Sequence, residues 1–475
     1  MRQLKGVTMY RVVGLIVTAV LLSTNRGVPN TSGASRSAMS DESGAGYGEL
    51  DQRPPIDVSA LLTAARGAPP IICSLAAQSV RGFGWGDWSD APSTPLGSVV
   101  AGNRGFDSRS EALPAADVQL LLEGLGAEDP CVRELSVRLL GRQKSETVAS
   151  GLISRLGGDS PALREVAALG LGLTQPTKAV EPLMRALRDA SPGVRANAVW
   201  ALGRIEDGRA LASVVNLFGD NADKVREAAV IAAGRMDSTS TTAALIRVLR
   251  QDNAAAVRRA AAWALGELES HEAVDALTGV LGHDADAQVR EMAAWALGEL
   301  DARSAAAGLA SAARRDADDK VRETATWALA EIGDRSSIDV LGAIAGSDRS
   351  ARVRGTAAWA IGQLRGGGKA PPGLVQLLKD ESDDARLKAA WALGQIGDST
   401  ALNAIRDAMR HENNNEVQRA LIRAMIKSGE RSEGALTELL GSSDPKVREA
   451  AVRGLAGNNS FNPWPWPWPR PRPIP

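Results

Sequence analysis

Six tryptophans recur at one position of a repeating sequence pattern, and most are followed four residues later by an acid or an amide. The tryptophans are Trp200, Trp263, Trp295, Trp327, Trp359 and Trp391. In the last five of these repeats the later residues are Glu267, Glu299, Glu331, Gln363 and Gln395. Residues four apart share one side of a helix, and an indole beside a carboxylate attracts cations and amphipathic groups. The pattern therefore predicts a ligand-binding groove lined by tryptophan and acid.

The spacing of these residues limits the ligand. Adjacent helices pack about 8–10 Å apart, and an extended or polyproline II peptide advances roughly 9–10 Å in three residues. A peptide or partner segment with one anchor every third residue fits this spacing, and a polysaccharide stacked on the indoles fits it less specifically. The alternative interpretation is structural, with adjacent indoles packing on one another as filler.

The charge of the predicted groove changes from acidic at the centre to basic toward the two ends. Glu291 and Glu323 add acids to its centre, four residues before a tryptophan. Basic residues take the outward positions toward the two ends, namely Arg204, Arg235, Arg419, Arg423, Lys427 and Arg453. A ligand with a basic centre is therefore preferred over a polyanion.

Catalytic and metal-binding patterns are missing from the sequence. The chain has three histidines, and His271-Glu272 lacks a second histidine at metalloprotease spacing. No P-loop or dinucleotide-binding glycine pattern stands out. A net charge of −1 gives no support for nucleic-acid binding. We therefore expect no catalytic residue, no metal and no cofactor.

The elements that carry the tryptophans follow from a regular arginine spacing. An apolar residue followed by Arg, in most cases Val-Arg, recurs at intervals of 30 to 32 residues, and a fixed period of this size is typical of a solenoid. The arginines are Arg133, Arg164, Arg195, Arg226, Arg258, Arg290, Arg322, Arg354, Arg386 and Arg448, with Gln418 in the remaining place.

One repeat contains two helical patterns. Counted from Val257 as position 1, positions 1, 5, 8, 9 and 12 are apolar and fall on one helical stripe, which predicts the core face. Position 7, the tryptophan, points about 150° away at 100° per residue and is expected to face solvent. A second apolar pattern over residues 273–281 predicts the other helix, and an Asp between the helices favours a turn. The fold class is therefore all-α.

The run Val-Arg-x-x-Ala-Ala-x-Ala-Leu-Gly-x-Leu/Ile, with an Asp five residues before the valine, resembles the HEAT repeat. It is most similar to the short bacterial type first described in phycobilisome lyases. The resemblance covers Leu113 to Gly457 and implies an α-solenoid, or superhelix, of about eleven two-helix repeats. It also implies a polar ladder of Asp and Arg between adjacent repeats and a concave surface lined by the second helix. Gln418 and Ile426 depart from the motif.

The segments outside the repeats predict export. Basic residues precede an apolar run over 12–22, whose length suits a signal peptide better than a membrane-spanning helix. We expect a periplasmic or cell-envelope location, with membrane attachment through this segment if it is not cleaved. The expected domains are a signal peptide or N-terminal anchor (1–34), a linker (35–55), an N-terminal helical capping region (56–112), the solenoid (113–457) and a Pro/Trp-rich disordered tail (458–475).

Cys73 and Cys131 are the two cysteines of the chain. In an exported protein they could form a disulfide that ties the capping region to the first repeat. Two buried free thiols are the alternative.

The tail is a candidate recognition element because alternating proline favours polyproline II. Its candidate contact residues are Trp464, Trp466, Trp468, Arg470 and Arg472. Basic and aromatic groups could dock in the acidic groove of the same chain. At ~3.1 Å per residue the tail could reach the repeat of Trp391 or Trp359, but not that of Trp263.

These features together predict a non-enzymatic, exported scaffold that binds an extended peptide or partner protein segment. A bilin-lyase-like, cofactor-attaching subunit is the alternative implied by the resemblance. Carbohydrate or cell-wall binding through the tryptophans is a second alternative.

Overall fold

The computed structural model describes residues 57–69, 73, 112–236, 238–364, 368–429, 437, 439–442 and 445–455. Every regular element in these ranges is an α-helix or a short 3-10 helix. The expected all-α class is therefore confirmed. None of the helices within this part of the chain combines the length and apolar character needed to cross a membrane. The expected signal peptide or anchor lies outside the described residues.

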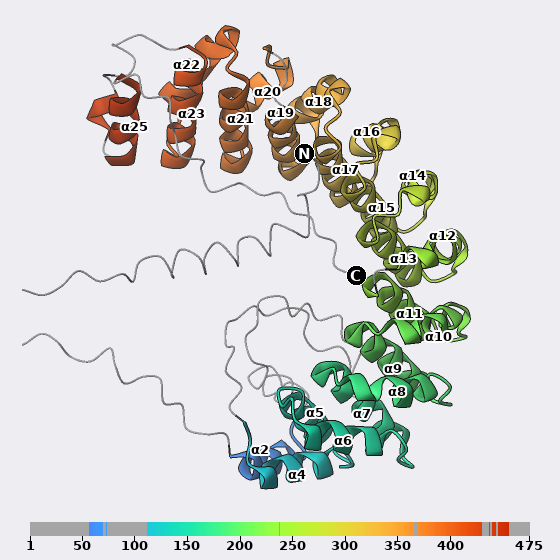
Figure 1. The fold of residues 1–475 in the computed structure, drawn as a ribbon. Coiled ribbons are helices and arrows are strands. Elements are labelled where there is room, and N and C mark those ends of the chain that lie inside the picture. The colour runs from blue at the N-terminus through green and yellow to red at the C-terminus, as the bar shows by residue number, and fades with distance from the viewer. Residues whose placement is uncertain are drawn as a thin grey trace, which may run out of the picture. The chain divides into compact units, whose positions relative to one another are not determined.

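The described helices form two rows, and each of the first ten repeats contributes one helix to each row, while the last repeat contributes α25 to the inner row (Figure 1). The inner row consists of α5 (Pro130–Leu140), α7 (Pro161–Thr174), α9 (Pro192–Ile205), α11 (Asp223–Arg235), α13 (Ala255–Glu267), α15 (Ala287–Glu299), α17 (Asp319–Glu331), α19 (Ala351–Leu364), α21 (Asp383–Ile396), α23 (Asn415–Lys427) and α25 (Pro445–Leu455). The outer row consists of α4 (Ala115–Gly124), α6 (Glu146–Arg155), α8 (Val180–Ala186), α10 (Leu211–Asn216), α12 (Thr242–Gln251), α14 (Val274–His283), α16 (Ala306–Arg315), α18 (Ile338–Ser347), α20 (Pro372–Gln376) and α22 (Leu402–His411). The eleven inner helices among the described residues agree with the expected number of repeats.

The core lies between the two rows and follows the predicted stripe. Val257, Ala261 and Leu265 of α13 are fully buried. From the outer row, Leu277 and Leu281 of α14 pack into the same cluster. Each repeat thus buries its apolar face against its own second helix and its neighbours, as a solenoid requires.

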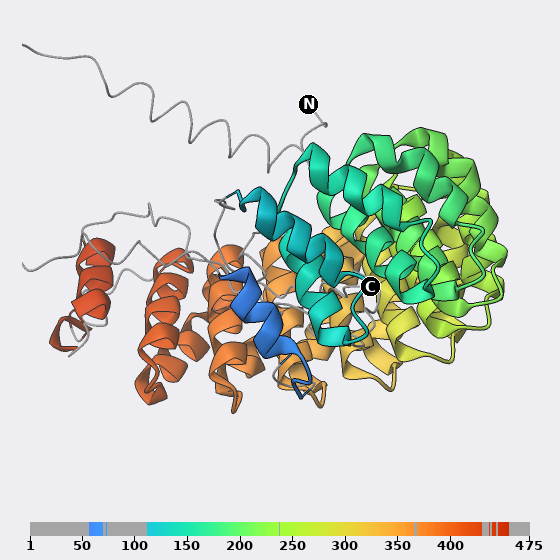
Figure 2. The same cartoon turned by 90° about the horizontal axis from the view of Figure 1, so that it is seen from below.

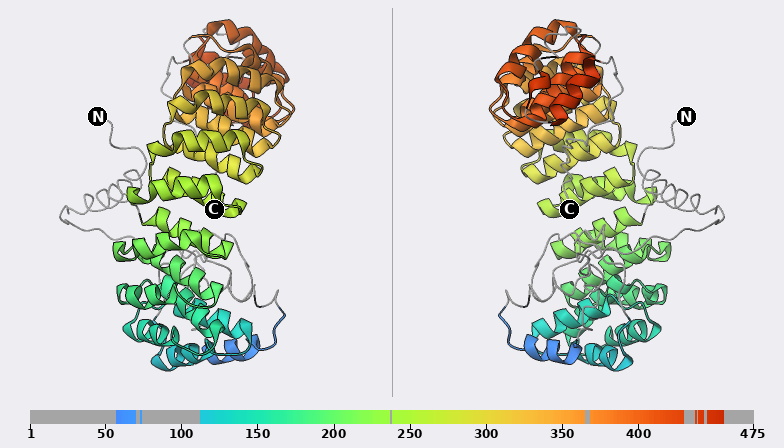
Figure 3. Two further views of the ribbon diagram at one scale, coloured as in Figure 1. Left: turned by 90° about the vertical axis from the view of Figure 1, so that its right-hand side faces the viewer. Right: turned by 90° about the vertical axis from the view of Figure 1, so that its left-hand side faces the viewer.

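Small residues let the inner helices approach one another closely. A Cβ placed on Gly203 of α9 would lie 2.7 Å from the Cα of Ala232 on α11. The same test at Gly234 places the Cα of Ala264 at 3.0 Å. On the outer row, a Cβ on Gly279 would meet nothing within 4 Å. The odd-numbered helices lie on the concave side of the stack (Figure 1), and Figure 3 shows the stack from its outer and its inner side.

An additional helix covers the first repeat. Helix α2 (Val58–Ala65) packs against α4 and α5, with Val58 and Leu62 buried in the core (Figure 2). The backbone N–H of Gly67 donates to Asp129 Oδ2 at 2.7 Å. Cys73 and Cys131 are joined by a disulfide. These contacts agree with a capping role for this part of the chain, although its predicted limits remain a prediction.

Candidate ligand-binding site on the inner face

An ion-pair ladder links successive repeats along one edge of the inner helices. Its rungs are Arg164–Asp189, Arg195–Asp220, Arg226–Asp252, Arg258–Asp284, Arg290–Asp316, Arg322–Asp348, Arg354–Asp380 and Arg386–Glu412. In a typical rung, Arg258 Nε and Nη2 donate to Asp284 Oδ2 and Oδ1 at 2.7 and 2.8 Å. Arg258 Nη1 also donates to the carbonyl of Asp252 at 2.9 Å. Each arginine therefore binds the acid of the next repeat and the turn of its own, as the resemblance implied.

Asp284 illustrates why a ladder acid favours its ionised form. Burial opposes ionisation of Asp284, but hydrogen bonds from Arg258 and from the backbone N–H of Asp286 outweigh it and lower the pKa of Asp284. The hydrogen bonds that Arg258 donates to Asp284 raise the pKa of the Arg258 guanidinium. Both charges are thus satisfied, so the ladder is a structural feature and offers no open site.

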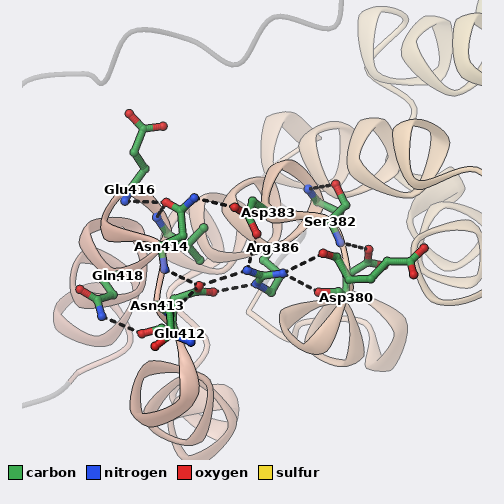
Figure 4. A network of polar contacts seen from close by, with 12 residues as sticks. Asp380, Ser382, Asp383, Arg386, Glu412, Asn413, Asn414, Glu416 and Gln418 are labelled. Atoms are coloured by element: carbon green, nitrogen blue, oxygen red, sulfur yellow. Dashed lines mark hydrogen bonds and ion pairs between the residues drawn. The ribbon is translucent and has the colours of Figure 1, made fainter.

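The ladder changes at its C-terminal end (Figure 4). Arg386 Nε donates to Glu412 Oε2 at 2.7 Å, with Glu in place of Asp. The next ladder position is Gln418, whose Nε2 donates only to the carbonyl of Glu412, at 2.7 Å, among the described residues. Asn414 Nδ2 donates to Asp383 Oδ2 at 2.7 Å and so ties the start of α23 to α21. A neutral amide therefore replaces the guanidinium at this step.

The tryptophans are more buried than a single helix predicts. Trp200, Trp295 and Trp359 are 3%, 5% and 4% exposed. Trp263 and Trp327 are half-buried and pack against the core cluster, as does Trp391. The expectation that position 7 faces solvent is therefore wrong for the three buried indoles.

The physical reason, at five of the six positions, is that the indole leans onto a glycine of the preceding inner helix. A Cβ on Gly298 of α15 would lie 2.8 Å from Cζ3 of Trp327. A Cβ on Gly362 of α19 would lie 2.3 Å from Cζ3 of Trp391. Glycine at position 10 of one repeat thus makes room for the tryptophan of the next. The indoles fill the space between repeats, which supports the structural interpretation of the series.

The residues at position 11 face solvent, as the sequence indicated. Glu267, Glu299 and Glu331 are exposed on three consecutive inner helices, α13, α15 and α17. Gln363 and Gln395 are exposed on the next two. The inner face therefore presents carboxylates over its central repeats, beside tryptophans that form its floor.

Acids at position 3 lie deeper in the inner face. Burial raises the pKa of Glu323, although its Oε2 pairs with Arg352 Nη2 at 2.5 Å. Burial likewise raises the pKa of Glu291, which accepts no hydrogen bond and forms no ion pair with any described residue. Carboxyl groups that resist ionisation are common at functional sites, although structural networks produce them too.

One indole of the series already binds a cation within the chain. The guanidinium carbon of Arg204 lies 5.4 Å from the ring centroid of Trp200. Arg204 is at position 11, four residues after Trp200 on α9, so both share one side of that helix. Neither this contact nor the role of the position-10 glycines was predicted. The signals were present as Arg in place of Glu at position 11, and as Gly one repeat before each of five tryptophans.

Clefts between the ends of successive outer helices are polar. One has a volume of about 860 Å³ and is lined by Lys379, Asp407 and His411 among others. Lys379 Nζ pairs with Asp407 Oδ2 at 3.0 Å, so its charges are matched internally. Within the described ranges, no group of His, Cys, Asp and Glu could hold a metal ion. The candidate contact residues of the tail lie outside those ranges.

The sequence and the fold can be compared with known proteins. The family described as HEAT repeats matches residues 149–232, 212–298, 280–362, 306–383 and 371–456. No curated protein matches the chain.

Among solved structures, a chain from the complex of Kap95p with RanGDP matches with a TM-score of 0.53 and 17% identity, over 84% of this chain and 61% of that one. An engineered protein matches with a TM-score of 0.40 and 21% identity, over 73% and 99%. The CpcE–CpcF phycocyanin lyase complex from Nostoc matches with a TM-score of 0.32 and 22% identity, over 52% and 93%. At these identities the likeness concerns the fold alone. The HEAT matches together span residues 149–456, well over half of the chain, and the chain therefore belongs to the HEAT repeat family.

Proposed function

We propose that this protein is a non-enzymatic, exported scaffold whose inner face binds an extended basic segment of a partner protein. The observation that carries the proposal is the run of exposed carboxylates Glu267, Glu299 and Glu331 on three consecutive inner helices. Membership of the HEAT repeat family supports a scaffold role. Carbohydrate stacking receives less support, because half of the indoles are buried.

Repeat geometry supports an elongated ligand. Equivalent side chains on neighbouring inner helices recur about every 8–10 Å, which three residues of an extended peptide also span. One basic side chain per three residues would place a cation near each carboxylate in turn. Contacts of this kind are weakened by salt, because exposed charges are screened beyond about 10 Å at 0.1 M ionic strength.

The proposal is tested with a synthetic peptide that carries Lys or Arg at every third residue in a Ser/Pro/Ala background. The expected result is binding to the full chain that weakens with salt, and no binding of the peptide with Gln in place of its cations. The triple substitution Glu267→Gln, Glu299→Gln and Glu331→Gln is expected to remove most of the affinity. Equal binding of the cationic and neutral peptides would rule the proposal out.

A matched control neutralises three exposed carboxylates of the outer row, Glu181→Gln on α8, Asp275→Asn on α14 and Asp339→Asn on α18. This variant changes the net charge by the same amount on the other side of the stack. Its affinity for the cationic peptide is expected to stay close to that of the natural protein. A loss as large as that of the inner variant would indicate general charge attraction without a site.

Export is part of the same proposal. A basic start followed by an apolar run supports it, and so does the disulfide between Cys73 and Cys131, since disulfides persist mainly in oxidising compartments. Cell fractionation is expected to place the protein outside the cytoplasm, with no free thiol in the denatured, unreduced chain. A wholly cytoplasmic product with two free thiols would contradict this.

The chain's own C-terminal tail is a second partner that we propose. Its arginines Arg470 and Arg472 complement an acidic surface. Its length limits it to the repeats near Gln395 and Gln363, so it would compete with a partner only there. Hydrogen exchange of α19 and α21 in the full chain and in a chain ending at Asn459 tests this. Identical exchange in both would show that the tail does not dock.

A further inference from the structure

The two ends of the helical stack differ in how they are covered. At the N-terminal end, α2 packs on α4 and α5, and the Cys73–Cys131 disulfide joins this segment to the first repeat. At the C-terminal end, η10 (Leu439–Gly441) and α25 are the described elements of the last repeat. In the described part of the chain two large apolar side chains are exposed, Leu440 on η10 and Val452 on α25, at 36% and 53%. Both therefore belong to the last repeat.

Val452 occupies a position that every earlier inner helix buries. Counted from Val447, it is at position 6 of its helix. The residues at position 6 of the other inner helices are fully buried, namely Val137, Ala168, Val199, Val230, Ala262, Ala294, Thr326, Ala358, Ala390 and Ile422. Ile422 of α23 shows what buries them, because it packs against Val447 of α25, the helix of the following repeat. Position 6 is thus the side on which the next repeat stacks, and Val452 has no further described repeat to cover it.

Leu440 shows the same loss of cover on the outer row. It lies seven residues before Val447. Where the equivalent residue is apolar it is buried or half-buried, as in Leu125, Leu156, Leu187, Phe218 and Leu378. The element that carries Leu378, η8 (Leu377–Lys379), contacts α22 of the following repeat. The last repeat therefore presents an apolar stacking face, and a solenoid needs a cover over such an end.

We propose that the chain covers this end with its own C-terminal tail, and that Phe461 and Trp464 pack on Leu440 and Val452. Residues 456–475 follow α25 directly and lie outside the described ranges. A tether of a few residues gives such a segment a local concentration on the order of millimolar, so that contacts of few side chains are sufficient. A second copy of the chain would have to make the same contacts from a far more dilute solution.

The sequence after α25 allows the tail to reverse direction. Gly457, Asn458 and Asn459 are residue types that favour turns. The distance from Leu455 to Trp464 can reach ~28 Å in polyproline II. Val452 lies only about 4.5 Å back along α25, at a rise of about 1.5 Å per residue. The segment is therefore long enough to fold back over the end of the stack.

The prolines of the tail determine which of its aromatic side chains share one side. Proline alternates with tryptophan from Pro463 onward and favours polyproline II, which has three residues per turn. Phe461 and Trp464 are three residues apart, so they point the same way at a spacing of about 9 Å, whereas Trp466 points elsewhere. Helices that pack side by side are about 8–10 Å apart, and η10 and α25 contact each other. The spacing of the two aromatic side chains therefore suits the two elements.

The proposed docking of the tail on the inner face uses Arg470 and Arg472 and leaves its tryptophans without a role. The two placements are compatible only near α21. Arg472 can lie ~25 Å beyond Trp464 in polyproline II, and α21 is three helix spacings, about 24–30 Å, from a segment packed on the far side of α25. A tail that covers the end can thus bring Arg472 to the repeat of Gln395 but not to that of Gln363.

The experiment compares hydrogen exchange of the full chain with that of a chain ending at Asn459. Removing the tail is expected to speed exchange of the α23 and α25 amides about tenfold, because uncovering two large apolar side chains destabilises the end repeat. A synthetic peptide of residues 460–475, added at millimolar concentration, is expected to restore slow exchange. Equal exchange of α23 and α25 in both chains would overturn the proposal, and protection that rises with protein concentration would then assign this end to a second copy.

Substitutions in the full chain locate the contact. Trp464→Ser is expected to reproduce most of the effect of removing the tail. Trp466→Ser is the matched control, since it removes the same side chain from another side of the tail, and should leave exchange unchanged. Equal effects of the two substitutions would overturn the assignment of Trp464 while leaving a tail that covers the end.

A substitution on the stack tests the other side of the contact. Val452→Gln, at an exposed helical position, is expected to speed exchange of α25 in the full chain. Removing the tail from this variant should then add little, because contacting groups are not additive. A further increase as large as in the natural chain would overturn the contact with Val452.

The outcomes separate this inference from docking on the inner face. Arg470→Gln combined with Arg472→Gln should leave exchange of α23 and α25 unchanged, because the proposed cover is apolar. Faster exchange there in the arginine variant, together with unchanged exchange in Trp464→Ser, would overturn the apolar cover. Docking on the inner face is judged from α19 and α21, so either proposal can fail alone.

Discussion

The ladder edge and the inner face belong to the same helices but differ in how much they vary from repeat to repeat. Along the ladder, seven rungs use Arg and Asp and an eighth uses Arg and Glu. On the inner face, position 11 changes from Arg204 and Arg235 to three glutamates, then to two glutamines and Lys427. A contact that every repeat needs in order to stack keeps one chemistry. Charge that varies over a constant fold is therefore the better indicator of where a partner binds.

The largest expected effect tests whether the enclosed indoles belong to the packing or to the surface. Trp295→Ala is expected to destabilise the protein by about 3–5 kcal/mol, comparable with roughly 2–5 kcal/mol for Leu297→Ala, since both side chains are buried. Trp327→Ala, at a half-buried position, should cost less. Denaturant unfolding measures all three. A small loss of unfolding free energy in Trp295→Ala would contradict a packing role for that indole, and with it the contrast between the constant packing contacts and the variable inner face.

A single rung should be nearly as important as a core side chain. Asp316→Ala removes the partner of Arg290, whose Nε lies 2.8 Å from Asp316 Oδ2, and both side chains are at most 15% exposed. Leaving that arginine unpaired should cost about 3 kcal/mol, at the low end for a broken buried pair. Asp407→Asn, in an exposed pair with Lys379, is the control and should change little. Thermal unfolding that shows equal shifts would contradict the structural role of the ladder.

Adding one methyl group to an inner helix and one to an outer helix compares how closely the two positions are packed. Gly298→Ala places a Cβ 2.8 Å from the Trp327 ring, and this overpacking should destabilise the protein by about 1–3 kcal/mol. Gly279→Ala on α14 meets nothing within 4 Å and should stabilise it by about 0.5–1 kcal/mol through helix propensity. The opposite signs can be read from denaturant midpoints. Two changes of the same sign would show that the inner helices are not closely packed there.

The smallest expected effect concerns how stability depends on pH, because Asp284 and Glu291 should contribute to it in opposite directions. The lowered pKa of Asp284 means that its contribution to stability is present above its unfolded pKa of about 3.9 and is lost as pH falls through the folded pKa. The raised pKa of Glu291 acts in the opposite sense, because ionisation is less favourable in the folded state.

Glu291→Gln should therefore stabilise the protein at neutral pH, with no gain below the unfolded pKa of about 4.3. The groups facing Glu291 are Arg259, Lys320, Asp318 and Glu323. Urea titrations of both proteins between acid and neutral pH give the comparison. A gain that is independent of pH would assign the effect to something other than the charge.

Much of this architecture could be predicted from one sequence because the same apolar and arginine pattern recurs in successive repeats. The apolar stripe through Val257 and Leu265 predicted the core correctly, since helical period alone decides which side of a helix is apolar. The ladder came only from the resemblance, because Arg258 and Asp284 are too far apart in sequence for a local pattern to pair them. Similarly, sequence left the pairing of Cys73 and Cys131 open.

The orientation of the tryptophans could not be predicted from one helix. A helical projection treats its surroundings as solvent, whereas each inner helix has a neighbour on either side. The missing information was in the preceding repeat, where Gly298 leaves the space that Trp327 fills. The exposure of each indole therefore depends on packing between repeats, and it differs between the buried Trp295 and the half-buried Trp263 although their local sequences are alike.

The glutamine at the last ladder step has a consequence for how the solenoid comes apart. Neighbouring repeats stabilise one another in sequence, so stability is passed along the stack step by step. A disulfide closes the N-terminal end, while Gln418 offers a neutral amide where its neighbours offer a guanidinium. The two ends are therefore unequal, and we expect fraying to start at α25 and α23 and to move toward α21. Limited proteolysis would then remove repeats from the C-terminal end one after another. The products would be a series of fragments that share one N-terminus and differ in length by about one repeat.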